Sequence, residues 1–522
     1  SDLCSSFDGS DSQEKGDNQP FLETKNLPIT YGLEILESVL QNGKSIFLKY
    51  KDMQFLLRIK TVPFLLRCIS SGKHFPIVLR SFRCINLLMN SEYLSVLELE
   101  MEVILSLLIH GLSIDSDSPI WKRTLALEIF TNVGQDFGLL SEIFMTYDNF
   151  PDRKHILTNL LNELLRLINT EDFSNCLCES GIVEKLDQPI VSTESLPLKV
   201  QYIHMLDKST PNPVNITYMI WLILTISNEW SDGLSTAALE ISQSNDESTE
   251  HEKLKDLTLV YKGVFDGLYE IHKKFLFSTS LDTPLFHSLI RAFQKLAHAA
   301  GILSLPEELN RCLKLFSFAI VTNDEINDAG RNSEIKPQQT TLINSMGDIT
   351  VRSNSSDRVP SVPIARSRFP SRSINQRQVS LFRALISLSV SLGPSVESEN
   401  WSYILKTWQW ISYYLYGPSA DIMEEFYAED VPPPPPITKN EVLSIENSIA
   451  KFFESSVSYG NTSFKTILGQ LITESQKVLS NKEAMFNTEA VAELKQSETT
   501  QIESCIFNRL FFITQIGELT IY

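Results

Sequence analysis

The stretch from residue 75 to residue 148 constrains the fold of this chain more than any other part. Its apolar residues recur every three to four positions, in three or four segments separated by short polar breaks. This spacing is typical of amphipathic helices. In the segment from about 92 to 112, the apolar face consists of Leu94, Leu97, Met101, Ile104, Leu105 and Leu108. Because such a face is buried only against a neighbour, the pattern predicts helices stacked on one another.

The same periodicity continues on both sides of this stretch. It predicts further helices near 29–43, 46–57, 62–69, 121–133, 154–168, 214–230, 254–277, 285–299, 307–321, 380–392, 401–416, 441–456, 464–480 and 502–516. No strong run of strict two-residue alternation indicates a strand. A chain of 522 residues is too long for one compact core. We therefore predict an all-α protein, an armadillo/HEAT-like α-solenoid of stacked helices, with separate helical bundles as the alternative.

Composition divides the chain into six predicted parts. They are a disordered acidic segment at 1–27, a helical domain at 28–190, helical repeats at 191–322, a disordered Arg/Ser-rich linker at 323–375, helical repeats with a polyproline insertion at 376–495, and the start of a further repeat at 496–522. The sequence starts without Met and ends without a closing signal. We expect it to be a piece of a longer protein.

The charge balance excludes some partners. The net charge of −19 argues against binding to nucleic acid, which needs a basic surface. It also disfavours attraction of the whole chain to anionic lipid. The most apolar run, 218–227, is about half the ~20 residues that a membrane-spanning helix needs. We expect a buried helix there, in a protein that is soluble or peripheral to a membrane.

The sequence contains no recognisable catalytic or metal-binding motif. There is no HExxH, GxSxG, Walker loop or GxGxxG pattern. Cys176 and Cys178 lack a second pair of ligands at zinc spacing. The seven cysteines are sparse, which suits reduced thiols. We therefore expect no enzyme activity, no cofactor and no metal site.

Three phrases in the central stretch resemble the HUS region, the homology-upstream-of-Sec-seven domain of the large ARF guanine-nucleotide exchange factors and their relatives. The phrases are EYLSVLELEMEVILSLLIH at 92–110, PIWKRTLALEIF at 119–130 and MTYDN at 145–149. The second resembles the family's P-x-WQR-x-LALE helix. The third falls where the family has the HUS box Asn-Tyr-Asp-Cys-Asp. The helical domain at 28–190 is thus predicted to be HUS-like.

Only Tyr147 and Asp148 match the HUS box. Thr146, Asn149 and Phe150 stand at its other positions. This departure from the exchange factors favours their divergent relatives, the Mon-two (Ysl-two) family. Helical phrases at 230–242, 376–393, 401–417 and 445–461 also resemble that family.

The resemblance implies a non-catalytic scaffold in Golgi–endosome vesicle-mediated transport, located in the cytoplasm and peripherally on trans-Golgi and endosome membranes. Its implied partners are a Dopey-family protein, an ARF-like small GTPase and a P4-type lipid flippase complex, and homo-oligomerisation is left open. The alternative is the regulatory, HUS-type region of an active ARF exchange factor whose catalytic domain lies outside this sequence. A generic armadillo-like transport adaptor is a third interpretation.

Two groups of residues are candidates for interaction. Tyr147 and Asp148 could brace the domain or dock another one, or they could be a packed tyrosine and a helix cap. Among the basic residues of the linker, Arg366, Arg368 and Arg372 could contact acidic lipid or an acidic partner. The alternative there is a solvated linker open to phosphorylation.

Two further segments have competing interpretations. The prolines at 432–436 suit a rigid polyproline II spacer, with docking to an SH3- or WW-like groove as the alternative. The aromatic residues between Trp401 and Tyr416 suit a helix core, and the alternative is a stripe that binds a partner.

Overall fold

The computed structural model describes residues 27–71, 74–177, 191–193, 201–243, 247–278, 280–321, 374, 376–416, 438–479 and 511–519. In these ranges the chain is helical, and the only β-type pairing is an isolated bridge between Val191 and Leu281. The all-α prediction is confirmed. The predictions for residues 1–26, for most of the 323–375 linker and for the prolines at 432–436 lie outside the described residues.

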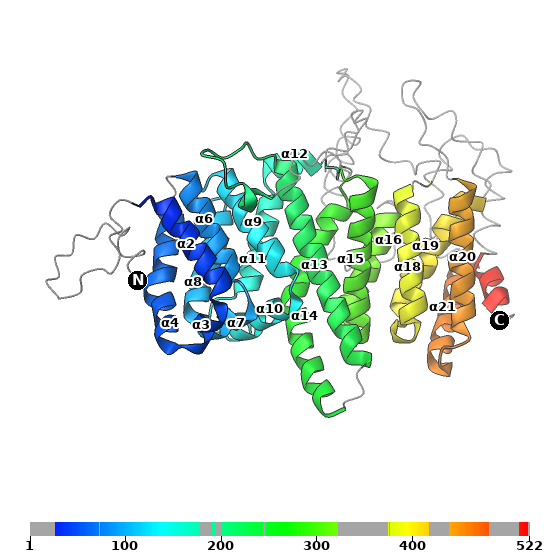
Figure 1. Ribbon diagram of the computed structural model, residues 1–522. Coiled ribbons are helices and arrows are strands. Elements are labelled where there is room, and N and C mark those ends of the chain that lie inside the picture. The colour runs from blue at the N-terminus through cyan, green and yellow to red at the C-terminus, as the bar shows by residue number, and fades with distance from the viewer. Residues whose placement is uncertain are drawn as a thin grey trace, which may run out of the picture. The chain divides into compact units, whose positions relative to one another are not determined.

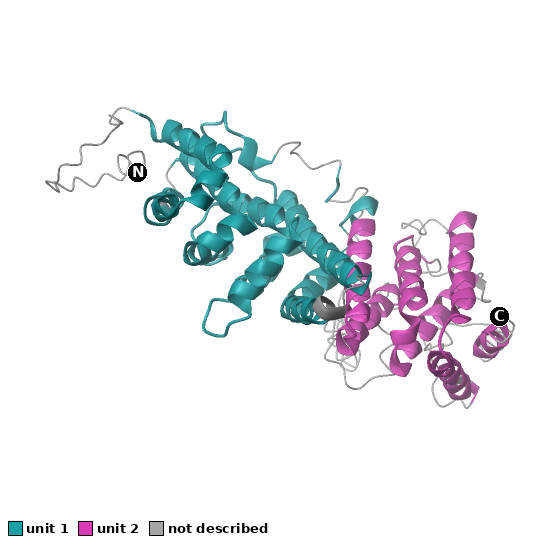
Figure 2. Cartoon of the chain, turned by 60° about the horizontal axis from the view of Figure 1, so that its bottom comes forward, with its two compact units in different colours: residues 1–178, 187–285 teal, residues 179–186, 286–522 magenta. Residues whose placement is uncertain are grey.

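The contacts between residues divide the chain into two units (Figure 2). Unit 1 consists of residues 1–178 and 187–285, and its long helices form two layers (Figure 1). One layer contains, in order of packing, α2 (Ile29–Asn42), α6 (Phe75–Leu88), α9 (Ile120–Gly134) and α13 (Ile216–Gln243). The other contains α8 (Glu98–Leu112), α11 (Ile156–Ile168) and α14 (Glu247–Leu276). Each helix packs on its successor in the same layer, and α8 on α9 and α13 on α14 join the layers. This is the stacking of an α-solenoid.

Shorter elements connect these helices. They are α3 (Lys44–Lys49), α4 (Lys51–Leu56), the π-helical η1 (Leu57–Thr61), α5 (Val62–Ser71), α7 (Ser91–Val96), α10 (Phe137–Ile143), the π-helical η2 (Phe144–Asp148), α12 (Glu171–Leu177) and the 3-10 turn η3 (Tyr202–His204).

The prediction of a single helix near 92–112 is wrong, because the structure has two helices there, α7 and α8. The side chain of Asn90 accepts a hydrogen bond from the Tyr93 amide and starts α7, and the backbone leaves the helical conformation at Leu97 before α8 begins. Leu94 and Leu97 are both buried. The break therefore divides the predicted helix into α7 and α8, which a sequence pattern continuous across Leu97 does not reveal.

Unit 2 consists of residues 179–186 and 286–522, and its helices also lie in two layers. The elements are α15 (Thr283–Ile302), whose first three residues belong to unit 1, α16 (Pro306–Ile320), α18 (Gln376–Leu392), the 3-10 turn η7 (Gly393–Ser395), α19 (Ser398–Tyr416), α20 (Lys439–Ser456) and α21 (Asn461–Leu479). α18 packs on α20, while α16 packs on α19 and α19 on α21. A capping box between Thr438 and Glu441 starts α20.

The three tryptophans of α19 lie in the core of unit 2. Trp401, Trp408 and Trp410 are all buried. The Trp401 and Trp408 rings lie 5.6 and 6.0 Å from the ring of Phe452 on α20. The core interpretation of these tryptophans is confirmed, because buried rings at these separations stabilise the packing of two helices.

Candidate functional site

The helix that resembles P-x-WQR-x-LALE, α9, connects to the elements around it through its charged side chains. The Lys122 ammonium donates to the carbonyl of Ile69, near the end of α5, at 2.8 Å. The Arg123 guanidinium donates to the carbonyls of Ser113 and Ser116, at 3.2 and 3.0 Å. These contacts satisfy backbone acceptors in the last turn of α5 and just after α8, where intrahelical donors are missing.

Glu128, the last residue of the LALE phrase, is completely buried. Its Oε1 accepts hydrogen bonds from the Tyr202 amide and the Tyr218 hydroxyl, both at 2.7 Å, and its Oε2 accepts from the Ile203 amide at 2.9 Å. Burial raises the pKa of this carboxyl, and the three hydrogen bonds oppose that rise. One side chain thus ties η3 and α13 to α9.

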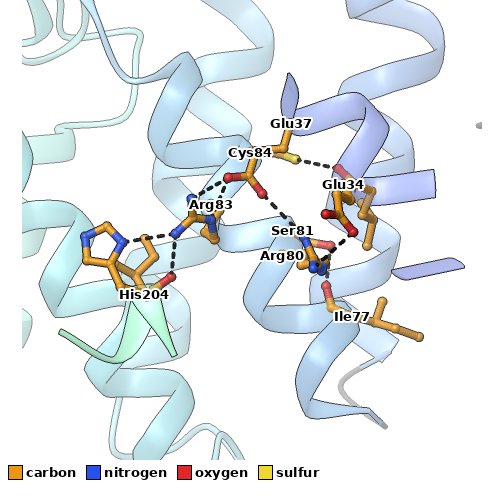
Figure 3. A network of polar contacts seen from close by, with 10 residues as sticks. Glu34, Glu37, Ile77, Arg80, Ser81, Arg83, Cys84 and His204 are labelled. Carbon is orange, nitrogen blue, oxygen red and sulfur yellow. Dashed lines mark hydrogen bonds and ion pairs between the residues drawn. The ribbon is translucent and has the colours of Figure 1, made fainter. Parts of the chain in front are cut away.

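Arg83 of α6 also contacts η3, the turn that Glu128 binds (Figure 3). Nη1 of Arg83 donates to the Ile203 carbonyl at 3.2 Å and lies 3.0 Å from Nδ1 of His204, while its Nε donates to Glu37 on α2 at 2.7 Å. Arg80, one turn earlier, forms an ion pair with Glu34 at 3.3 Å. Carboxylates on α2 and groups of η3 therefore fix the two arginines of α6.

Tyr147, one of the two predicted site residues, lies in η2 and is completely buried. Its hydroxyl donates to the carbonyl of Glu98 at the start of α8, at 2.6 Å. Burial raises the pKa of the hydroxyl, and the nearby Glu98 carboxylate adds to that rise. The Glu98 side chain itself pairs with Arg153. Tyr147 therefore connects η2 to α8.

Asp148, the other predicted site residue, caps α11. Its Oδ2 accepts from the Leu157 amide at 3.1 Å, and its Oδ1 accepts from the amide and hydroxyl of Thr158, at 3.0 and 3.1 Å. These amides belong to the first turn of the helix, which has no intrahelical acceptors for them. The side chain is 8% exposed, and burial raises its pKa against the effect of these hydrogen bonds. The cap interpretation fits this geometry.

We call this set of contacts, centred on Glu128 and the pair Tyr147 and Asp148, the α9–η2 brace. The sequence pointed to the pair but not to Glu128, Lys122 or Arg83. The available signal for Glu128 was a carboxylate within the apolar run LALEIF, since a buried charge needs several hydrogen bonds. Because the pair is buried, it can affect a partner only through the elements that it holds.

Other predicted features are placed as follows. Arg366, Arg368 and Arg372 lie outside the described residues, as does Cys178. Within the ranges that the structure describes, no group of His, Cys, Asp and Glu side chains could hold a metal ion. No helix of that part of the chain is long and apolar enough to cross a membrane.

Comparison with known proteins relates the chain to one family. A family model of the Mon2/Sec7/BIG1-like HUS domain matches residues 1–156. The MON2 protein of Saccharomyces cerevisiae is 45% identical over 541 aligned residues, which include the whole of this chain and 33% of that protein. The MON2 homolog of Schizosaccharomyces pombe is 24% identical, and the match covers 50% of this chain and 17% of that protein. The human MON2 homolog is 29% identical, and the match covers 26% of this chain and 9% of that protein.

No solved structure matches the chain significantly. The chain spans about one third of the length of its Saccharomyces cerevisiae relative. That similarity extends through both units, and the matched HUS domain contains α9 and η2. The chain belongs to the Mon2 family, and the α9–η2 brace lies largely in its Sec7-like HUS domain.

Proposed function

We propose that this part of the protein is a non-catalytic scaffold in vesicle-mediated transport between the Golgi and endosomes. Similarity to a MON2 protein along the whole chain is the observation that supports this proposal most directly. The two-layered solenoid is consistent with it, because stacked helices provide extended surfaces that bind other proteins. Recognition would occur through apolar anchors within a polar rim.

We further propose the partners that the family resemblance implies. They are a Dopey-family protein, an ARF-like small GTPase and, through them, a P4-type lipid flippase complex on the trans-Golgi and endosome membranes. The α9–η2 brace supports this indirectly. By connecting α6, α8, α9, α11 and α13, it fixes the surface that the first unit presents to a partner.

Pull-down of the chain against a Dopey protein, and against the GTPase loaded with GTP or GDP, tests this proposal. We expect retention of the Dopey protein, and of the GTPase when it is loaded with GTP. Failure to retain either would remove the scaffold role from this part of the protein. The variant Tyr147→Phe removes only a buried hydroxyl, so the pull-down with this variant tests whether the hydroxyl itself is needed for binding.

A second candidate is the regulatory region of an active ARF exchange factor. The family model that matches residues 1–156 covers Sec7 and BIG1-like proteins as well as Mon2 proteins. A Sec7 domain with a catalytic glutamate elsewhere in the full-length protein would favour this candidate. Nucleotide exchange on an ARF protein by the full-length protein is the measurement that separates it from the scaffold.

A further inference from the structure

We propose that a groove in unit 2, lined by α15, α18 and α20, binds an acidic peptide segment of a partner protein. The three helices stand side by side in Figure 1. The groove has a volume of about 460 Å³, within the range of roughly 300–1,000 Å³ that is common for ligand sites. We call it the α15–α18–α20 groove. The proposal stands on unit 2 alone and goes beyond the trafficking role.

The lining of this groove is cationic. Its charged residues are Arg291 from α15, Arg383 from α18 and Lys451 from α20, whereas no carboxylate lines it; His287 from α15 is also part of the lining. The sequences of α15 and α18 contain no Asp or Glu. In a chain with 64 acidic and 45 basic residues, two such helices side by side concentrate positive charge in one place. The field of the groove therefore favours an anionic ligand.

The three permanent cations are available for binding. Arg291, Arg383 and Lys451 are exposed, and none of them forms an ion pair with another residue of the described ranges. Arg80 and Arg83 on α6 of unit 1 differ, because they pair with Glu34 and Glu37. An arginine whose N–H groups are not engaged can bind a carboxylate through two parallel hydrogen bonds in the plane of its guanidinium group.

The uncharged residues that line the groove favour a peptide over other anionic ligands. Ile290, Ala384 and Ile386 are nearly buried and supply apolar surface between the cations, and Gln294 supplies an amide. His287 Nε2 lies 3.1 Å from the Ser380 hydroxyl, which connects α15 to α18 at one end of the groove. An apolar floor with a cationic rim fits a segment in which acidic residues flank one or two apolar ones. Nucleic acid is disfavoured by the net charge of −19.

A lipid surface fits these features less well. Peripheral proteins bind membranes with protruding cations and exposed apolar side chains that enter the bilayer. None of the residues that line the groove is an exposed large apolar residue. Because the cations surround a recess, they are better placed to enclose a chain segment than to lie on a flat layer of head groups.

Fluorescence anisotropy with a labelled peptide of Asp and Glu residues around one Leu-Phe pair tests the proposal. We expect the chain to bind this peptide, and to bind it more weakly as salt is added. The double variant Arg291→Glu/Arg383→Glu should weaken binding by roughly tenfold or more, because it reverses two charges at the rim. The control Lys255→Glu/Lys262→Glu changes the same charge at exposed positions of α14 and should bind as the parent does.

Three results would overturn the proposal. They are no binding of the acidic peptide, equal binding by the groove variant and the parent, and equal loss in the groove variant and the α14 control. Sedimentation with vesicles that contain phosphatidylserine is the remaining comparison. If the chain binds these vesicles through Arg291 and Arg383 but does not bind the peptide, the groove is a lipid site. Circular dichroism confirms that each variant keeps its helices.

Discussion

At the scale of single residues, buried polar side chains decide how the helices of unit 1 are joined. Tyr147 and Asp148 have neighbouring positions in the sequence but serve different elements, α8 and α11. A sequence motif identified them as a pair. Both residues lie in the π-helical turn η2, and their hydrogen-bond partners are seen only in the structure.

Replacement of Tyr147 by phenylalanine should lower the free energy of unfolding by about 1 kcal/mol, because one buried hydrogen bond to the Glu98 carbonyl is lost while the ring stays packed. Urea denaturation followed by circular dichroism measures this change. Retention of the Dopey protein in the pull-down should be unaffected. A loss of binding without a loss of stability would contradict a purely structural role for this hydroxyl.

His272 makes stability depend on pH. This residue of α14 is completely buried, lies 2.9 Å from the Ser231 hydroxyl, and has its pKa lowered by burial from 6.5 to about 3. Between these values the unfolded chain takes up a proton at His272 and the folded chain does not. The stability that the neutral histidine contributes is therefore present above pH 6.5 and is lost as the pH falls toward 3.

The difference in unfolding free energy between the protein and its His272→Gln variant should change by at most about 1.4 kcal/mol per pH unit in that window. Urea denaturation at several pH values measures it. The variant is expected to lose less stability on acidification than the protein. An exposed histidine, His251, provides the control His251→Gln, which should leave the pH dependence in place. A constant difference across the window would contradict the expectation.

At the scale of elements, α9 is the helix on which the HUS-like part of the chain is assembled. Its resemblance to P-x-WQR-x-LALE was visible in the sequence, and so was its apolar periodicity. The residues that Glu128 binds could not be identified from the sequence, because Tyr202 and Tyr218 lie 74 and 90 residues further along the chain.

The variant Glu128→Gln should destabilise unit 1 by about 1–3 kcal/mol, since it turns an acceptor into an amide donor that faces buried donors. Tyr202, Ile203 and Tyr218 together donate three hydrogen bonds to the carboxylate, which a single amide oxygen cannot accept in the same geometry. Thermal unfolding measures the change. Glu252→Gln, at an exposed position, is the matched substitution that should have little effect.

Close packing of α14 on α11 requires a glycine. A Cβ added at Gly267 would lie 2.6 Å from the Leu161 Cβ, an atom fixed by the α11 backbone. The variant Gly267→Ala should therefore cost about 1–3 kcal/mol of unfolding free energy through overpacking. In α21, a Cβ at Gly469 would meet nothing within 4 Å, so Gly469→Ala should be neutral or stabilising. Destabilisation by both variants to the same extent would contradict this packing.

At the scale of the whole molecule, the stacking of the helices predicts which elements lose stability when one contact is weakened. In stacked helices each element contacts mainly its neighbours, so stability is lost first next to a weakened contact. Hydrogen exchange in the Gly267→Ala variant should increase in α14 and in its neighbours α11 and α13. Exchange in α20 and α21 should stay as it is in the parent protein. A uniform increase throughout the described helices would instead indicate one cooperative unit.

The sequence by itself determined that the chain is helical, where most of its long helices lie, and which family it resembles. These properties depend on local periodicity and short phrases, which a linear sequence carries. Only the tertiary structure showed the break at Leu97, the three donors on Glu128, and Asp148 as the cap of a helix that begins eight residues later. It also assembled the α15–α18–α20 groove from helices that are far apart in the chain. The physical reason is that a buried polar group or a groove is defined by its neighbours in space, which helical periodicity does not specify.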